Sequence, residues 1–201
     1  MASDFFYFLS TLPALTMPSQ PGDAWGGPCW DEFLAQCRRL LSARDAETVA
    51  ALELCPPAAY LADTERAGAG LPSLARDWYD WQVVMRNALA RRRAARLGGR
   101  GVTPRPEAQA FPNDVKRLDA LFEQAAPVER AWAWYALQWS RLDELAAREQ
   151  FNLNVVAAYA LKVRLMEEAR RYDRARGAEA FKGMVDGVVA AAQARRDETA
   201  P

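Results

Sequence analysis

Hydrophobic residues recur every three or four positions along most of this chain, which is the spacing of one face of an α-helix. Residues 73–97 contain the longest such run. Its apolar face consists of Leu74, Trp78, Trp81, Met85 and Leu89. Ser73 is the predicted N-cap of this helix, and Gly98 is the glycine predicted to follow its C-terminus. The pattern predicts one long helix against whose apolar face other elements pack.

The same spacing predicts further helices before and after this one. The expected helices cover residues 29–41, 42–54, 113–124, 127–146, 152–176 and 178–195. Ser42, Asn113 and Asn152 are the predicted N-caps, and Pro127 suits a first helical turn. Residues 18–28 and 56–72, which contain several Pro and Gly, are expected to be mainly loops. The sequence therefore predicts an all-α fold, a bundle of about six to seven helices.

The N-terminal segment cannot be assigned from its pattern. The run Asp4–Leu9 is aromatic but too short for its periodicity to distinguish a strand from a helix, so we expect an irregular aromatic segment. It has no basic residues and soon reaches Pro13, so no signal peptide is expected. Trp25, in the loop that follows, either covers the core or contacts a partner.

Residues 98–112 contain several Gly and Pro and predict a linker or mobile loop. The chain is expected to form a single helical domain over 1–201, in which this loop would join lobes 1–97 and 113–196. Residues 79–89 also align without a gap to residues 151–161, with shared Val-Val and Ala-Leu pairs. Two explanations stay open, a duplicated helical unit and a chance similarity between two amphipathic helices.

Composition narrows the classes of function. Hydrophobic residues make up 51% of the chain, and 26 basic residues balance 26 acidic ones, which indicates a folded protein without a general affinity for nucleic acid or membranes. The absence of histidine excludes Ser-His-Asp and Cys-His catalysis and histidine-ligated zinc. Cys29, Cys37 and Cys55 form no CxxC pair and are expected to be structural thiols of a reduced, cytoplasmic protein.

The carboxylates give no sign of catalysis. Pairs such as Asp77 with Asp80 have arginines nearby in the sequence, which is typical of a salt-bridged helix surface. No Gly-rich phosphate loop follows a predicted strand. We therefore expect no catalytic residue, no cofactor and no metal site.

An arginine cluster ends the long predicted helix. Arg91, Arg92, Arg93 and Arg96 lie in its last turns, where positive charge is favourable to the helix dipole. The cluster is either a solvated helix end or a contact for an anionic partner. In the second case the stretch Arg86–Arg100 would serve a stand-alone helical adaptor or an RNA-binding module.

Four segments of the chain resemble a bacterial family of unknown function whose genes commonly lie in V/A-type ATPase operons. They are residues 6–15 (FYFLSTLPAL), 30–37 (WDEFLAQC), 79–96 (YDWQVVMRNALARRRAAR) and 154–162 (NVVAAYALK). The two aligned segments, residues 79–89 and 151–161, are also similar to the Tyr-Asp-x-x-Asn-Leu…Arg pattern of the V/A-type ATPase C subunit, which is called d in eukaryotes. That protein is an all-helical socket between the rotor shaft and the membrane ring.

The resemblance implies a non-catalytic protein, similar to the C subunit, that couples the shaft to the ring or assists assembly. The implied partners are rotor-shaft or membrane-ring subunits, with the protein held at the inner face of the membrane through the complex. We expect apolar contacts to supply affinity and charges to set orientation. The expected contact residues are Phe5, Tyr7, Leu12, Pro13, Tyr79, Asp80, Arg86, Arg91, Arg92, Arg93 and Arg96.

Overall fold

The predicted all-α fold is confirmed in the computed structural model, which describes residues 2–18, 26–98, 101, 103–123, 126–170, 179 and 182–186. The helices are α1 (Ala2–Thr11), α2 (Trp30–Leu40), α3 (Ala43–Ala50), α4 (Ala58–Ala62), α5 (Thr64–Gly68), α6 (Ser73–Arg96), α7 (Pro112–Leu121), α8 (Pro127–Ala146) and α9 (Leu153–Arg170). A short helical segment also covers residues 182–186. Within these ranges the only extended pairing is an isolated bridge between Thr16 and Gly26.

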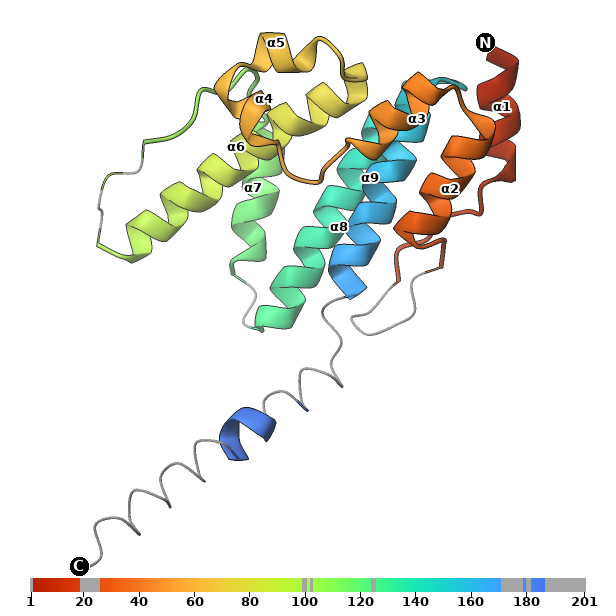
Figure 1. Ribbon diagram of the computed structural model, residues 1–201. Coiled ribbons are helices and arrows are strands. Elements are labelled where there is room, and N and C mark those ends of the chain that lie inside the picture. Colours follow the sequence, from red (N-terminus) through yellow and green to blue (C-terminus); the bar gives the residue numbers. More distant parts are fainter. Residues whose placement is uncertain are drawn as a thin grey trace, which may run out of the picture.

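Helices α8 and α9 lie side by side in the middle of the molecule (Figure 1). Helices α1, α2 and α3 lie on one side of this pair, and α4 to α7 lie on the other. Helix α9 contacts α2, α3, α6 and α8, which explains why the sequence of its first half is apolar almost all round. Its second half is also largely buried, since Met166 and Ala169 are enclosed near the C-terminal end.

One hydrophobic cluster joins the two halves of the described chain. It runs from Phe8 in α1 to Val163 in α9 and includes the fully buried rings of Trp78 and Trp81. Trp81 stacks on Trp78 at 5.2 Å between ring centroids and on Trp134 of α8 at 5.8 Å. The cluster contains residues from before and from after the segment 98–112. This segment therefore connects two parts of the chain that share one core.

Several local signals in the sequence are confirmed. Trp30, Phe33, Leu34 and Cys37 of α2 are buried along one face. The Ser42 hydroxyl accepts a hydrogen bond of 3.1 Å from the backbone N–H of Asp45, as expected of an N-cap. Pro127 occupies the first turn of α8. The side chain of Asn152 accepts hydrogen bonds from the backbone of Asn154 and Val155 at 3.0 and 3.2 Å, at the start of α9.

Other predictions about helix ends were wrong by a residue or more. Helix α6 begins at Ser73 after Pro72, and its first turn is satisfied by Asn154 of α9 rather than by Ser73. Asn154 Oδ1 accepts from the backbone N–H of Leu74 at 3.3 Å, and its Nδ2 donates to the Ser73 hydroxyl at 2.9 Å. Helix α7 begins at Pro112, with Phe111 and not Asn113 as the preceding residue. The contacts of Asn154 fasten the N-terminus of α6 to α9.

One predicted loop and the unassigned N-terminal segment contain helices. Residues 56–72 hold the short helices α4 and α5, and the N-terminal segment that the pattern left open forms α1. Helices α4 and α5 could not be predicted from hydrophobic periodicity, because each has only five residues. Trp25 and most of residues 178–195 lie outside the described residues.

The two aligned segments occupy different places in the fold. Tyr79 and Asp80 lie in the second turn of α6, and Tyr79 is fully buried. Their aligned partners, Phe151 and Asn152, precede α9, and Phe151 is half exposed. A duplicated unit would place aligned residues in equivalent positions, so the structure favours a chance similarity between two helices.

Candidate partner-binding surface

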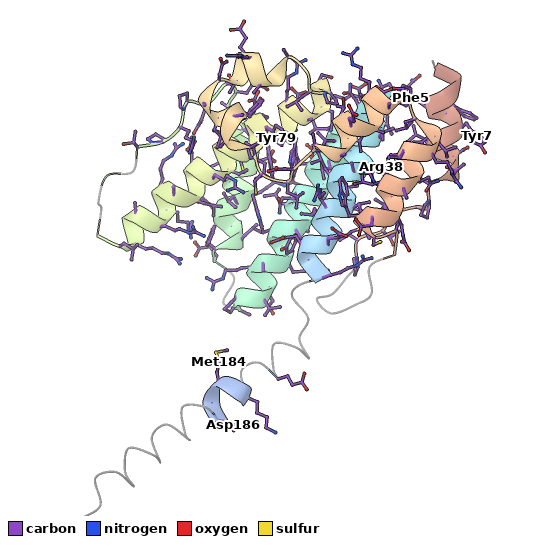
Figure 2. The ribbon with its side chains drawn as sticks, in the orientation of Figure 1. Phe5, Tyr7, Arg38, Tyr79, Met184 and Asp186 are labelled. Carbon is purple, nitrogen blue, oxygen red and sulfur yellow. The ribbon has the colours of Figure 1, made fainter. Side chains whose placement is uncertain are left out.

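The expected contact residues separate into three places. Phe5, Tyr7, Leu12 and Pro13 lie in or after α1, the arginines lie toward the C-terminal end of α6, and Tyr79 and Asp80 lie within the body. In Figure 2 Tyr7 projects from the outer side of α1, whereas Tyr79 lies among packed helices. The structure therefore does not bring these residues into one surface.

Three large aromatic side chains, two in α1 and one in the turn before α9, are exposed on the described chain. Phe6, Tyr7 and Phe151 have exposed fractions of 55%, 60% and 50%. The rings of Phe6 and Phe151 contact each other edge to face, with 4.9 Å between centroids. We call these three residues the aromatic patch. Exposed apolar clusters of this kind are typical of surfaces that bind another protein.

Helix α1 carries aromatic side chains on two sides, and only one of these sides packs against the core. Phe8 is fully buried against Phe33 of α2, with 6.4 Å between ring centroids. Phe5 and Leu12 are half-buried and pack on the same core. Phe6 and Tyr7 follow Phe5 directly, and a helix turns about 100° per residue, so they point away from that core.

The end of α1 is fixed to α9. The hydroxyl of Tyr159 donates a hydrogen bond of 3.0 Å to the backbone carbonyl of Pro13, which is itself exposed. Burial raises the pKa of Tyr159 to about 12, so this donor stays protonated at neutral pH. The bond holds α1, and with it Phe6 and Tyr7, in a defined position on the body.

Phe151 joins the aromatic patch from the turn before α9 and was not among the expected contact residues. Its backbone φ is 35°, a conformation that L-residues other than Gly, Asn and Asp rarely adopt. Its ring contacts Phe6, and the next residue, Asn152, caps the start of α9. Strained backbone conformations cluster at functional sites, so Phe151 is a candidate contact residue that the sequence pattern did not indicate.

Tyr79 and Asp80 both make hydrogen bonds within the protein, and Tyr79 is fully buried. The fully buried Tyr79 accepts, at its hydroxyl oxygen, a hydrogen bond of 3.1 Å from the backbone N–H of Glu53. Asp80 accepts one of 2.9 Å from the Tyr60 hydroxyl. Burial and this hydrogen bond to a carboxylate raise the pKa of Tyr60. Tyr79 is therefore unavailable to a partner in this structure, and the expectation for it is corrected.

Two of the four arginines in the cluster are paired with carboxylates of the protein. Arg91 forms an ion pair with Glu107, and Arg92 reaches Asp119 at 3.0 Å and Glu123 at 2.8 Å. The Arg92 guanidinium also lies over the Phe122 ring, 4.8 Å from its centroid. These carboxylates lie 16 to 31 residues away in the sequence, so the pattern of α6 alone could not reveal them.

Three expected arginines are less engaged. Arg96 lies 6.0 Å from the centroid of the same Phe122 ring, and Arg86 contacts the thiol of Cys55. Arg93 is exposed and forms no ion pair with any residue that the structure describes. At the end of α6 the charges of Arg91 and Arg92 are thus neutralised, whereas Arg93 and Arg96 form no ion pair with a described carboxylate.

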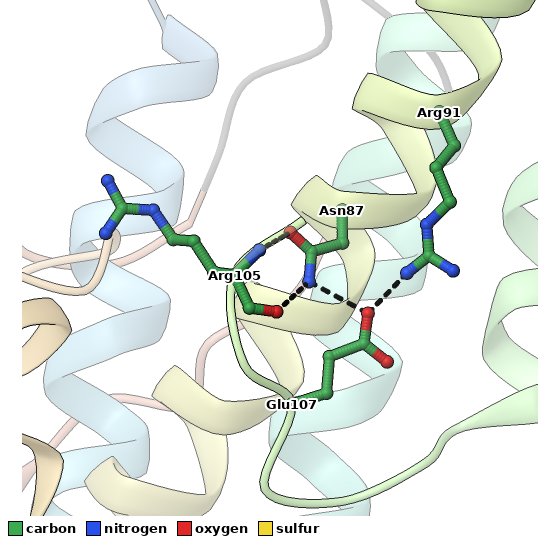
Figure 3. A network of polar contacts seen from close by, with 4 residues as sticks. All are labelled: Asn87, Arg91, Arg105 and Glu107. Carbon is green, nitrogen blue, oxygen red and sulfur yellow. Dashed lines mark hydrogen bonds and ion pairs between the residues drawn. The ribbon is translucent and has the colours of Figure 1, made fainter. Parts of the chain in front are cut away.

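The buried side-chain amide of Asn87 holds part of the segment 98–112 against α6 (Figure 3). Asn87 is only 5% exposed; its Nδ2 donates to the backbone carbonyl of Arg105 and to Oε1 of Glu107, both at 2.8 Å. Its Oδ1 accepts from the backbone N–H of Arg105 at 3.0 Å. Residues 105–107 are thus held to the helix, which differs from the predicted mobile loop.

An open hollow of about 510 Å³ lies at the start of α7. Its charged side chains are Asp114, Arg117, Arg141 and Glu144. Arg141 donates to Glu144 at 3.2 Å, and Arg117 lies 3.6 Å from Asp114 and 3.8 Å from Glu144. These groups neutralise one another, so the hollow presents no uncompensated charge.

Cys37 is a free thiol buried in the core. Burial raises the pKa of Cys37 to about 12, which keeps it a neutral thiol in the core. Within the described ranges no group of three acidic or cysteine side chains is placed to hold a metal ion. In the same ranges no helix has the length and apolar character needed to cross a membrane.

Comparison with known proteins adds no relative. This chain matches no family model, no curated protein sequence and no solved structure. The aromatic patch therefore rests on the geometry of this molecule alone.

Proposed function

We propose that this protein is a non-catalytic interaction subunit of a bacterial V/A-type ATPase, with a role like that of the C subunit or of an assembly factor. The partner class comes from the resemblance of residues 6–15, 30–37, 79–96 and 154–162 to the family found in such operons. The observation that carries an interaction role is the aromatic patch, which leaves three large rings half exposed on a packed helical body.

The patch has the chemistry expected of a protein contact. Aromatic side chains are enriched in the centres of protein interfaces, where they bury much area at a low cost in conformational entropy. Phe6 and Tyr7 lie on one helix and Phe151 at the start of another, and Tyr159 ties the end of the first helix to the second. A surface that is already ordered loses less entropy on binding.

The contacts that join both halves of the body also support a coupling role. A protein that transmits torque or position needs elements that do not move independently. Helix α9 contacts helices from both halves of the described chain, and Asn154 and Asn87 fix α6 at its start and in its second half. The RNA-binding alternative receives less support, because Arg91 and Arg92 are paired with carboxylates.

The proposal is tested by purifying the tagged full-length protein from its own cells and identifying co-purifying proteins by mass spectrometry. We expect rotor-shaft or membrane-ring subunits with the wild type, and a loss of at least about tenfold with Phe6→Ser/Tyr7→Ser. Leu97→Ser is the matched control, because Leu97 is an exposed apolar residue on the distant end of α6. Recovery of nucleic acid, or of no ATPase subunit, would reject the ATPase role.

A further inference from the structure

Two arginine side chains in the hollow at the start of α7 make few hydrogen bonds. Arg117 lies 3.6 Å from Asp114 and 3.8 Å from Glu144, and both distances are beyond hydrogen-bonding range. Arg141 donates one hydrogen bond, of 3.2 Å, to Glu144. Each guanidinium carries five N–H donors. The two groups therefore balance the charge of the two carboxylates, but most of their donors have no partner among the residues that the structure describes.

The side chain of Arg141 is already ordered in the hollow. It is only 12% exposed, and its guanidinium lies over the Phe111 ring, 5.0 Å from the centroid. An ordered side chain loses little conformational entropy when a ligand binds. A planar guanidinium also presents pairs of parallel N–H groups, which fit the two oxygens of a carboxylate. Arg141 is therefore suited to bind a carboxylate.

The first turn of α7 adds further donors to the hollow. Asn113 and Asp114 line it, and within the described chain their backbone N–H groups have no hydrogen-bond partner. The residue before the helix, Phe111, has no side chain that could cap this turn. The N-terminal end of a helix carries a partial positive charge, and its unpaired N–H groups favour anions. The helix and the two arginines thus offer donors to the same space.

We propose that this hollow binds a carboxylate group, held by Arg117, Arg141 and the first turn of α7. A carboxylate adds one negative charge beside Asp114 and Glu144, whereas a phosphate would add nearly two and be repelled more strongly. The volume of about 510 Å³ admits a small carboxylic acid or the C-terminal end of a chain. The hollow shares no residue with the aromatic patch, so this site does not depend on the ATPase proposal.

Glu144 is the group that a bound carboxylate would replace on the arginines. Its side chain is 46% exposed and is free to turn toward solvent. Its hydrogen bond to Arg141, at 3.2 Å, is longer than the roughly 2.7–2.9 Å usual between charged partners. An exposed ion pair of this kind contributes little to stability. A ligand that reaches both arginines with better geometry would therefore displace it.

The experiment follows the NMR signal of the Trp81 indole N–H while ligands are added to the full-length protein. Trp81 reports on the hollow because its Nε1 donates to Asp114 at 2.8 Å, and Trp81→Phe assigns the signal. The probes are N-acetyl-trialanine with a free C-terminal carboxylate, the same peptide with a C-terminal amide, and acetate. We expect both carboxylates to shift the signal in a saturable way and the amide to leave it unchanged.

The two carboxylate probes distinguish the sources of the ligand. A peptide that binds at least about tenfold more tightly than acetate would assign the site to the C-terminus of a chain. A smaller difference would assign it to a small carboxylic acid. Both results support a carboxylate site. A signal that no probe shifts, or that the acid and the amide shift equally, would overturn the proposal.

Four variants make the test specific to the hollow. Arg117→Gln and Arg141→Lys should each raise the dissociation constant of the free-acid peptide at least about fivefold. Glu144→Gln removes the competing carboxylate and should lower this constant about threefold. Arg93→Gln, at an exposed arginine outside the hollow, is the control and should leave the constant unchanged. Urea unfolding verifies that each variant folds. Arginine variants that bind like the wild type, or a Glu144→Gln variant that binds no more tightly, would contradict the site.

Discussion

The side-chain amide of Asn87 pairs with the backbone of Arg105 on both sides, accepting from its N–H at 3.0 Å and donating to its carbonyl at 2.8 Å. This is the hydrogen-bonding pattern that a neighbouring peptide group would offer. A single side chain of α6 thereby orders a segment that has no helix of its own. The same Nδ2 also reaches Glu107, which binds Arg91 as well.

Asn87→Ala should destabilise the protein by about 1 to 3 kcal/mol, because three hydrogen bonds are lost at a buried position. Urea unfolding measures the loss, and hydrogen exchange should show faster exchange in residues 103–110. Arg91→Ala is the control, since its side chain is 55% exposed and an exposed ion pair contributes only about 0 to 1 kcal/mol. Equal effects of the two variants would contradict the role given to Asn87.

Phe151→Gly should be more stable than Phe151→Ala by about 1 kcal/mol, because only glycine adopts a positive φ without strain. Both variants lose the contact with Phe6 equally, so the comparison isolates the backbone. Thermal and urea unfolding provide the measurement. Inside a helix alanine is instead more stable than glycine, and Ala90 of α6 serves as the reference position. Ala90→Gly should destabilise the protein by about 1 kcal/mol.

Trp81→Phe should destabilise the protein more than Trp78→Phe does. Both rings are fully buried and donate one hydrogen bond from Nε1, but Trp81 donates to the carboxylate of Asp114 at 2.8 Å. Trp78 donates to the neutral carbonyl of Leu54 at 3.0 Å. Loss of the hydrogen bond to the carboxylate should lower the free energy of unfolding of Trp81→Phe by about 1.5 to 3 kcal/mol. Loss of the hydrogen bond to the carbonyl should lower that of Trp78→Phe by about 0.5 to 1.5 kcal/mol, and the change in packing is similar in both variants. The reverse order in urea unfolding would contradict this assignment.

The stability of the protein should fall at alkaline pH. Tyr159 has its pKa raised from 10.0 to about 12 by burial. In the unfolded chain it ionises near its ordinary pKa, so its contribution is complete below pH 10 and is lost as the pH rises to about 12. Tyr159→Phe should lose less stability over this range than the wild type. Urea unfolding at each pH provides the test, and parallel curves would contradict it.

The sequence predicted elements whose signals are local. The stripe of α2, the Ser42 cap and the first-turn Pro127 each depend on residues within a few positions of one another. Helices α4 and α5 were missed because a helix of one turn has no measurable period. The N-cap of α6 lies one residue before the predicted one, and that of α7 lies two residues before it. The first turn of α6 is satisfied by Asn154, which is 80 residues from Leu74 in the sequence.

Surface residues were harder to predict, because their exposure depends on residues that are distant in the sequence. The Tyr-Asp pair at Tyr79 suggests an exposed side chain. In the structure Tyr79 lies in the core, where its hydroxyl oxygen accepts a hydrogen bond from the backbone N–H of Glu53. Arg92 is part of a basic run, but Asp119 and Glu123 from α7 and its end neutralise it. Phe151 becomes part of the aromatic patch only because α9 brings it against α1. Each outcome depends on tertiary contacts that periodicity does not encode.

The most direct test of the proposed role measures energy coupling in membrane vesicles. Cells lacking this protein are complemented with the wild type, with Phe6→Ser/Tyr7→Ser, or with the Leu97→Ser control, and ATP-driven ion transport is compared with ATP hydrolysis. We predict that the deletion and the patch variant lose coupled transport, while the wild type and the control restore it. Vesicles that couple hydrolysis to transport equally well without the protein would contradict the account.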